Sequence, residues 1–317
     1  MNVHALTDRL VAAAGGLYGD KMKFFREGCE SPQVAEIIRN LEMDFITPGE
    51  ARPPNDGGRE NEGPASEEYR VPVRYGEIEA TARYRLIHWA GPTARSIIYH
   101  HGSGETNYTA RIRKIAAAMD SKESLNIIAV SVPFNSSMKE YLYGVGRLDR
   151  FAFMFASSVR ITEELVSYLK SLGAERIACV GMSLGGWVTN LHHSYYNSCS
   201  EYLPIFAGAA PDHLFSETVY TKMLAEAVRS PENLSRITEA LNFEQDFAQQ
   251  SNENVHPCMA RYDQFIRFDR QTGIYRREQI RVLERGHVTG AAAIKELAGH
   301  LSYGAFLQHG QNSARPI

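Results

Sequence analysis

The residues best suited to chemistry, by type and spacing, are a serine and two flanking glycines in the run Gly181-Met182-Ser183-Leu184-Gly185. This G-x-S-x-G pattern follows an apolar stretch typical of a strand and precedes a stretch typical of a helix. A serine between a strand and a helix occupies a strained turn that exposes its hydroxyl, and small neighbours let the helix pass close to the strand. The first turn of that helix adds N–H donors and a dipole that favours negative charge. We therefore predict that Ser183 is a nucleophile.

The elements that must position Ser183 follow the rhythm of an α/β fold. Three continuous apolar runs are typical of strands buried on both faces of a parallel sheet, at residues 96–99, 127–130 and 177–180. Helical segments alternate with these runs near residues 107–120, 148–172 and 185–198. Because such crossovers are right-handed, we expect helices on both faces of the sheet.

Other strands flank this central pattern. Residues alternate between apolar and polar in two neighbouring stretches, which predicts paired antiparallel strands at 71–75 and 78–86. Later apolar runs predict strands at 203–207, 257–260 and 280–283, followed by a closing helix at 291–307.

The chain is predicted to have an N-terminal helical extension, a connector and one large α/β domain. Residues 1–46 have helical spacing at Leu6, Leu10 and Val11, again at Met22, Phe24 and Phe25, and again from Val34 to Leu41, with Ser31 as N-cap and Pro32 as the first helical residue. Residues 47–68 are polar and rich in turn formers, and the main domain occupies residues 69–317. Within it, residues 212–253 are either a small lid or a plain surface crossover.

The turn at Ser183, together with a strand that ends in His100-His101-Gly102-Ser103-Gly104, resembles the α/β-hydrolase superfamily over roughly residues 69–310. Within that superfamily the chain is similar to serine esterases. The resemblance implies a mostly parallel sheet with helices on both faces. It also implies an oxyanion hole built from the N–H groups of Ser103 and Leu184, with Gly104 as the next candidate for the first donor. The residues expected to contact substrate are Gly102, Gly104 and Tyr108.

The chain order in that superfamily is nucleophile, acid and then histidine, which points to a late histidine after the last strand. His287 follows the predicted strand at 280–283 and precedes a helix, so we expect it to be the base. Asp263 follows the strand at 257–260 and is the expected acid. Asp212 is the main rival because some members carry the acid one strand earlier, and Asp269 is a third candidate.

The other histidines are expected to be structural. His100 and His101 have no accompanying carboxylate cluster, and we expect no metal there. The adjacent pair His192 and His193 points about 100° apart on a helix, which makes a shared chelate improbable. His256 precedes a strand, and His300 and His309 fall within or beyond the final helix.

Composition excludes several classes of protein. The 317 residues are 44% hydrophobic and 22% charged, the balance of a globular protein with a core. With 34 Lys and Arg against 37 Asp and Glu, the net charge of −3 provides no basic surplus for nucleic acid. The N-terminus lacks the pattern of a secretory signal, and no stretch approaches the roughly 20 apolar residues of a membrane span. We expect a cytoplasmic protein whose four dispersed cysteines are free thiols.

The resemblance implies a serine hydrolase that cleaves a carboxylic ester or thioester through an acyl-enzyme, without a cofactor. A ligand-binding protein of the same fold without turnover is the alternative from another class. An acyltransferase and a peptidase are alternatives within the superfamily. The apolar face of residues 4–45 is expected to pack on the main domain, with covering the site or forming a homodimer as alternatives.

Overall fold

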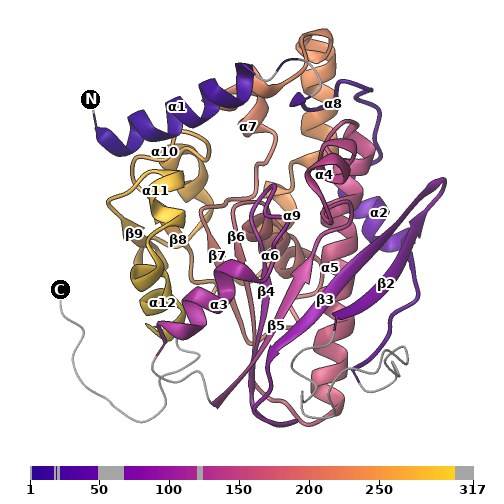
Figure 1. Cartoon of the computed structure of the whole chain (residues 1–317), viewed down its shortest axis with the longest axis vertical. Helices are drawn as coiled ribbons and strands as arrows, with labels where there is room; N and C mark the ends of the chain where they lie inside the picture. Colours follow the sequence, from indigo (N-terminus) through magenta and orange to yellow (C-terminus); the bar gives the residue numbers. More distant parts are fainter. Residues whose placement is uncertain (1, 18, 20–21, 49–67, 120–123, 304–317) are drawn as a thin grey trace.

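The computed structural model describes residues 2–17, 19, 22–48, 68–119 and 124–303, which form one sheet of nine strands (Figure 1). In their order across the sheet the strands are β1 (Glu42–Met43), β2 (Glu68–Tyr75), β3 (Ile78–His88), β5 (Leu125–Ser131), β4 (Arg95–His100), β6 (Ile177–Met182), β7 (Glu201–Ile205), β8 (Cys258–Ala260) and β9 (Arg281–Leu283). The strands from β5 to β9 are parallel, whereas β1, β2 and β3 form an antiparallel edge. The predicted strands and their directions are confirmed.

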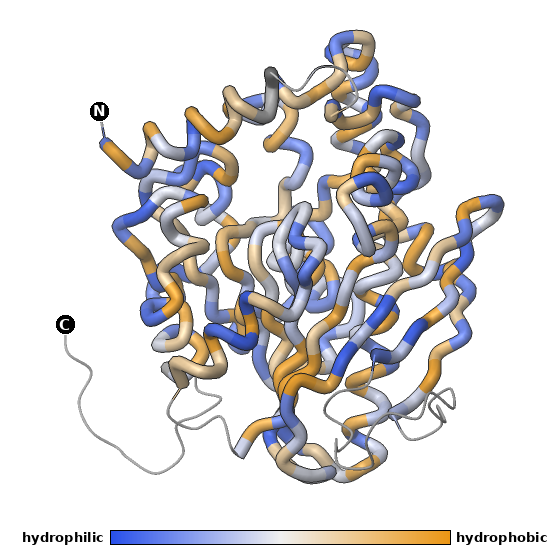
Figure 2. The backbone as a smooth tube through the Cα atoms, viewed as in Figure 1, coloured by the Kyte–Doolittle hydropathy of each residue, from blue (hydrophilic) through white to orange (hydrophobic). Residues whose placement is uncertain are grey.

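Helices cover both faces of the sheet, as the sequence predicts. Successive residues of a strand point to opposite faces. Ile97 and Ile127 therefore pack toward α3 (Ala110–Ala117) and α12 (Ile294–Tyr303). Their neighbours Ile98 and Ile128 pack toward the opposite face, with α5 (Leu148–Ser171) and α6 (Leu184–Tyr195). Figure 2 shows the resulting concentration of hydrophobic residues along the central strands.

The N-terminal extension contains two helices, α1 (Val3–Leu17) and α2 (Val34–Asn40). The helical spacing predicted at Met22, Phe24 and Phe25 is wrong. The backbone at Phe25 is left-handed, with φ 57°, and its N–H donates to the Val145 carbonyl at 2.9 Å. Both phenylalanines are buried in an aromatic cluster, where their rings pack against Phe151 and Phe215. Tertiary burial thus overrides the local periodicity.

The start of α2 also differs from the prediction. Its N-cap is Gln33, two residues after the predicted N-cap at Ser31, and the helix begins at Val34. The Ser31 hydroxyl instead donates to the Pro32 carbonyl at 2.8 Å, which occupies it locally. Most of the predicted polar connector, residues 49–67, lies outside the described residues.

The crossover from β7 to β8 is a set of short helices: α7 (His213–Ser216), η4 (Val219–Met223), η5 (Glu226–Val228), α8 (Pro231–Leu241) and α9 (Glu244–Ala248). Helix α8 begins at Pro231, and its N-cap is Ser230, whose hydroxyl accepts the Asn233 N–H at 3.3 Å. Phe243 and Phe247 are fully buried and attach the crossover to the core.

The remaining helices lie in connections and after the last strand: α4 (Met138–Gly144), α10 (Phe268–Gln271), η6 (Thr272–Ile274), η7 (Arg277–Gln279) and α11 (His287–Ala291). The closing helix predicted at 291–307 begins later, as α12 at Ile294, and Ala291 is the last residue of the separate helix α11. The last residues of the predicted helix, 304–307, lie outside the described residues. All four cysteines are buried free thiols. Among the helices of the described residues, none combines the length and the apolar character that crossing a membrane requires.

The burial of Phe25 makes the N-terminal segment a part of the core, and this can be tested by stability. Phe25→Ala removes a fully buried ring and is expected to lower the free energy of unfolding by about 3–5 kcal/mol. Leu10→Ala, at a side chain that is 61% exposed, is the matched control and is expected to change it by less than about 0.5 kcal/mol. Urea unfolding followed by circular dichroism measures both. Equal stability of the two variants would contradict this role for the segment.

Candidate active site

Ser183 occupies the turn between β6 and α6, as the motif predicts. Its backbone has φ 55° and ψ −113°, a conformation that L-residues rarely adopt. The positions two residues before and after Ser183 must be glycines, because the backbone of a neighbouring element lies where a side chain would begin. A Cβ on Gly181 would lie 2.0 Å from the carbonyl oxygen of Gly185, and a Cβ on Gly185 would lie 2.3 Å from that of His100. Helix α6 therefore passes against β6 and β4 with no room for a side chain.

The structure brings Ser183, His287 and Asp263 into one hydrogen-bonded chain. The Nε2 atom of His287, the first residue of α11, lies 3.0 Å from the Ser183 Oγ. Its Nδ1 atom lies 2.6 Å from Oδ2 of Asp263. The carboxylate accepts the proton on Nδ1, which leaves the lone pair on Nε2 facing the serine hydroxyl. The arrangement has the geometry of a nucleophile, a base and an orienting acid.

Asp263 lies in the loop after β8 and is only 4% exposed. Its second oxygen, Oδ1, accepts the N–H groups of Phe265 at 2.8 Å and Ile266 at 2.7 Å. These two bonds hold the carboxylate in place without occupying the oxygen that faces the imidazole.

The charge on Asp263 controls the titration of His287. Burial of the imidazole disfavours its charged form, but the negative charge of Asp263 and the hydrogen bond that it accepts outweigh burial. The pKa of His287 is therefore raised above its usual 6.5. A raised pKa makes the imidazole a stronger base toward the Ser183 hydroxyl.

The two predicted oxyanion donors lie beside Ser183. Leu184 is the first residue of α6, and N–H groups in the first turn of a helix have no partner within the helix. Ser103 lies in the loop after β4, which is joined to the serine turn by the bond from the Gly185 N–H to the His101 carbonyl at 3.1 Å. The Ser103 hydroxyl is bonded to the Tyr141 hydroxyl. The side chain of Ser103 is therefore already engaged in a hydrogen bond.

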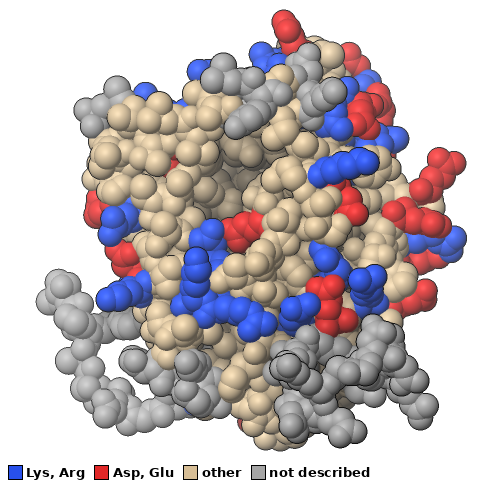
Figure 3. All heavy atoms as spheres, in the orientation of Figure 1, with Lys and Arg blue, Asp and Glu red and all other residues tan. Residues whose placement is uncertain are grey.

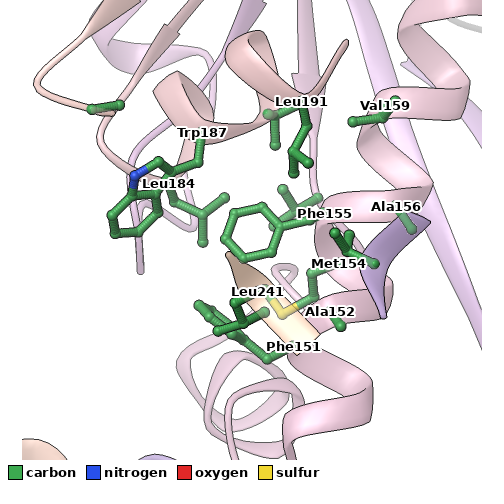
Figure 4. Close-up of a cluster of buried hydrophobic side chains, with 14 of the residues drawn as sticks. Phe151, Ala152, Met154, Phe155, Ala156, Val159, Leu184, Trp187, Leu191 and Leu241 are labelled. Atoms are coloured by element: carbon green, nitrogen blue, oxygen red, sulfur yellow. The ribbon is translucent and has the colours of Figure 1, made fainter. Parts of the chain in front are cut away.

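A cavity of about 460 Å³ opens at Ser183, and Figure 3 shows a hollow on the same face of the molecule. Its charged residues form an ion pair, since Arg111 donates from Nη2 to Glu105 at 2.6 Å. Its other walls are mainly apolar and come from separate segments of the chain. They include Val11, Phe24, Phe151, Leu184, Trp187, Leu214, Tyr220, Phe265 and Ile266. Figure 4 shows Leu184 and Trp187 of α6 facing the phenylalanines of α5.

The residues predicted to contact substrate do not all lie at this cavity. Gly102 lines it, as do Ser103 and Leu184. Gly104 has φ +70° and lies beside Tyr141 and Met138. Tyr108 does not line the cavity, because its ring is buried and its hydroxyl donates to Glu68 at 2.8 Å. Contact between Tyr108 and substrate therefore stays a prediction.

The rival acids are bonded to other groups. Asp212 is buried, and its oxygens accept the Thr238 hydroxyl and the Asn242 amide, each at 3.0 Å. Asp269 pairs with Arg267 at 2.5 Å. Among the described residues, Asp263 is the acid candidate that contacts His287.

The two adjacent pairs of histidines have structural partners. His100 contacts the Thr162 hydroxyl at 2.8 Å, and His101 contacts the Gly102 carbonyl at 2.7 Å. His192 lies 3.1 Å from Glu163, and His193 lies 3.1 Å from the Ser251 carbonyl. No group of three or more potential metal ligands is found in the described part of the chain.

Sequence analysis missed the way in which α1 reaches this site. Leu6 and Leu10, predicted as its packing face, are 40% and 61% exposed, whereas Asp8 and Ala12 are buried. Val11 is 47% exposed and lines the cavity. In the sequence, the buried face of α1 is indicated only by the spacing of Asp8 and Ala12, which are four residues apart. An acidic residue is seldom buried, so this spacing is a poor indication of a buried face.

No family model matches the sequence, and no curated protein matches it. Solved structures do resemble the model. An acylaminoacyl peptidase from Pyrococcus horikoshii matches with a TM-score of 0.51 and 13% identity, covering 78% of this chain and 43% of that one. An acetyl xylan esterase from Paenibacillus sp. R4 matches with a TM-score of 0.50 and 12% identity, covering 94% of both chains. This chain thus spans about two fifths of the length of the acylaminoacyl peptidase.

At such low identity these likenesses concern the fold. The mostly parallel sheet, the serine turn after β6 and the helices on both faces agree with them. The protein has the α/β-hydrolase fold.

Proposed function

We propose that the protein is a serine hydrolase that cleaves a carboxylic ester or thioester through Ser183, His287 and Asp263. The observation that carries this proposal is the continuous chain of contacts at the cavity, 3.0 Å from Ser183 Oγ to Nε2 and 2.6 Å from Nδ1 to Asp263. An alcohol becomes a nucleophile when a base is within hydrogen-bond reach and a third group orients that base.

In the first step, Ser183 Oγ attacks the carbonyl carbon of the ester while His287 Nε2 takes the hydroxyl proton. The charge that develops on the carbonyl oxygen is stabilised by the N–H groups of Ser103 and Leu184, each typically worth about 2.7–4 kcal/mol of barrier. Asp263 stabilises the imidazolium that forms. His287 then gives its proton to the leaving alcohol or thiol, and an acyl-enzyme remains on Ser183.

In the second step, His287 removes a proton from water, which attacks the acyl carbon. His287 then returns this proton to Ser183 Oγ as the bond to the acyl carbon breaks and the acid is released. The position of His287 supports this step, because its ring lies between Phe206 and Phe265, with centroids at 5.7 Å and 5.2 Å, and keeps one orientation. The same group thus acts first as base and then as acid in each half of the reaction.

The cavity walls support an uncharged, mainly apolar acyl group. Phe151, Leu184 and Trp187 form an apolar wall beside Ser183, and burial of such surface favours a hydrocarbon substituent. Arg111 is already paired with Glu105, so it provides no unpaired positive charge for a carboxylate.

The alternatives share parts of this machinery. A peptidase and an acyltransferase of this fold use the same acyl-enzyme and differ in leaving group or acceptor. A ligand-binding protein without turnover needs no base. The buried carboxylate at Nδ1 of His287 therefore supports catalysis, because it orients the imidazole as a base and stabilises the imidazolium that forms when His287 takes a proton.

Ser183→Ala is expected to abolish turnover of a short-chain p-nitrophenyl ester, with a loss in kcat of about 10⁶-fold, because it deletes the attacking oxygen. The wild type should also gain the mass of one fluorophosphonate label, which Ser183→Ala should not gain. Ester turnover is followed by absorbance and labelling by intact-mass spectrometry.

Ser235→Ala is the control, since Ser235 is an exposed serine on α8. It should keep wild-type labelling and turnover. A wild type that neither labels nor turns over ester would shift the weight to a binding protein, and activity that persists in Ser183→Ala would overturn the triad.

The pH dependence of kcat/KM is expected to show a limb that rises with pH and belongs to His287, because only neutral imidazole accepts the serine proton. Since the pKa of His287 is raised, this limb should lie above the usual 6.5. Asp263→Asn removes the cause, so the limb should move to lower pH while kcat falls by about 10⁴-fold. Initial rates from pH 5 to 9 measure both effects, and an unmoved limb would argue against Asp263 as the partner.

A further inference from the structure

Helix α1 lies against the two loops that carry Asp263 and His287, although it is far from both in sequence. Figure 1 shows α1 crossing over α10 and α11. The His4 ring stacks on Tyr262 with centroids 6.2 Å apart, and the Arg9 side chain donates from Nε to Gln264 at 3.1 Å. The N-terminal extension therefore contacts the acid loop on both sides of Asp263.

Asp8 joins these two loops through its carboxylate, which is completely buried. Its Oδ2 atom accepts the N–H of His287 at 2.8 Å and that of Gln264 at 3.1 Å. Its Oδ1 atom accepts the N–H of Val288 at 3.0 Å. Both oxygens act as acceptors, as expected of an ionised carboxylate, and bonds of this type are roughly twice as strong as those between neutral groups.

The start of α11 depends on this carboxylate. The first N–H groups of a helix have no partner inside it, and the N-cap side chain usually accepts one of them. Here the N-cap is Gly286, which has no side chain. Asp8 accepts two of the free N–H groups from another part of the chain, those of His287 and Val288.

Gly286 is also the residue that lets α1 come this close. A Cβ at this position would lie 2.7 Å from the His4 carbonyl oxygen and 2.8 Å from Oδ2 of Asp8. A glycine at the N-cap thus leaves the space that the Asp8 carboxylate occupies, and this carboxylate accepts the N–H groups that an N-cap side chain would otherwise accept.

The charges that face the His287 imidazole are Asp263 from the loop after β8, Asp8 from α1 and Arg111 from α3. The two carboxylates raise the pKa of His287 and Arg111 lowers it. Burial raises the pKa of Asp8 itself, and the three N–H groups that it accepts act in the opposite direction.

We propose that Asp8 is a positioning residue of the active site: it fixes the relative placement of His287 and Asp263 by bonding the loops that carry them. The N-terminal helix is then a working part of the enzyme. This inference rests on the proposed hydrolase function, since it concerns the same base and acid. Asp8 does not touch substrate, and it acts through the backbone of His287 and through its charge on the imidazole.

Asp8→Asn is the main test, because the amide keeps the size of the side chain but loses the charge and one acceptor. A small misplacement of a base costs up to about 100-fold, so kcat should fall by about 10- to 100-fold with little change in KM. Removing the negative charge also lowers the pKa of His287. The rising limb of kcat/KM should therefore move to lower pH, which a purely structural defect would not produce.

Leu10→Ala, at an exposed side chain of the same helix, is the control and should leave kcat and the pH limb unchanged. Asp8→Glu keeps the charge with a longer side chain. It should lose less activity than Asp8→Asn and keep the pH limb near that of the wild type. Thermal unfolding verifies that each variant is folded. If Asp8→Asn is unfolded, Asp8→Glu becomes the test variant. A kcat equal to that of the wild type would then overturn the proposal, and a lower kcat at unchanged KM would support it.

The His287 pKa is also measured directly by NMR of protein with ¹³C-labelled histidine, assigned by the signal that His287→Gln loses. A lower pKa in Asp8→Asn supports the proposal whether or not an ester is hydrolysed. A folded Asp8→Asn protein with wild-type pKa and kcat would overturn it. A wild type that is inert toward ester and fluorophosphonate would instead refute the hydrolase, and the NMR titration would still test Asp8.

Discussion

The close approach of helix α6 to strands β6 and β4 is the constraint on which the site depends. Gly181 and Gly185 leave no space for a Cβ, since one would lie 2.0 Å or 2.3 Å from a carbonyl oxygen. The chain can pass from β6 into α6 only through a sharp turn, and that turn forces Ser183 into a left-handed backbone with φ 55°. The strain is held by packing on both sides of the sheet. The serine hydroxyl and the first N–H of the helix consequently face the same cavity.

Parallel strands deliver the partners of Ser183 to the same edge. Strands β6, β8 and β9 run in one direction, so the residues after their carboxyl ends lie together although 104 residues separate Ser183 from His287. The order of the strands decides which carboxylate meets the imidazole. Asp263 follows β8, the neighbour of β9, and contacts His287. Asp212 follows β7, one strand farther away, and bonds instead to Thr238 and Asn242.

The N-terminal extension illustrates how a local pattern can mislead. Apolar spacing in α1 points to Leu6 and Leu10 as the buried face, yet both are exposed and Asp8 is completely buried. A carboxylate is costly to bury unless it is bonded, and here three backbone N–H groups from two distant loops satisfy it. Phe24 and Phe25 follow the same logic. Their spacing is that of a helix, but both rings are buried in the aromatic cluster around Phe151 and the segment is not helical.

The sequence by itself determined the α/β class, the serine turn and the candidates for base and acid. These features are local, because apolar runs, glycines beside a serine and a histidine after a strand are all visible within a few residues. Only the tertiary structure placed Asp263, and not Asp212, in contact with His287, bonded the Tyr108 hydroxyl to Glu68 and brought Asp8 to the loop of His287. Each of these depends on which distant segments share the edge of the sheet. The physical reason is that a hydrogen bond depends on distances in space, and residue spacing along the chain does not specify them across a long crossover.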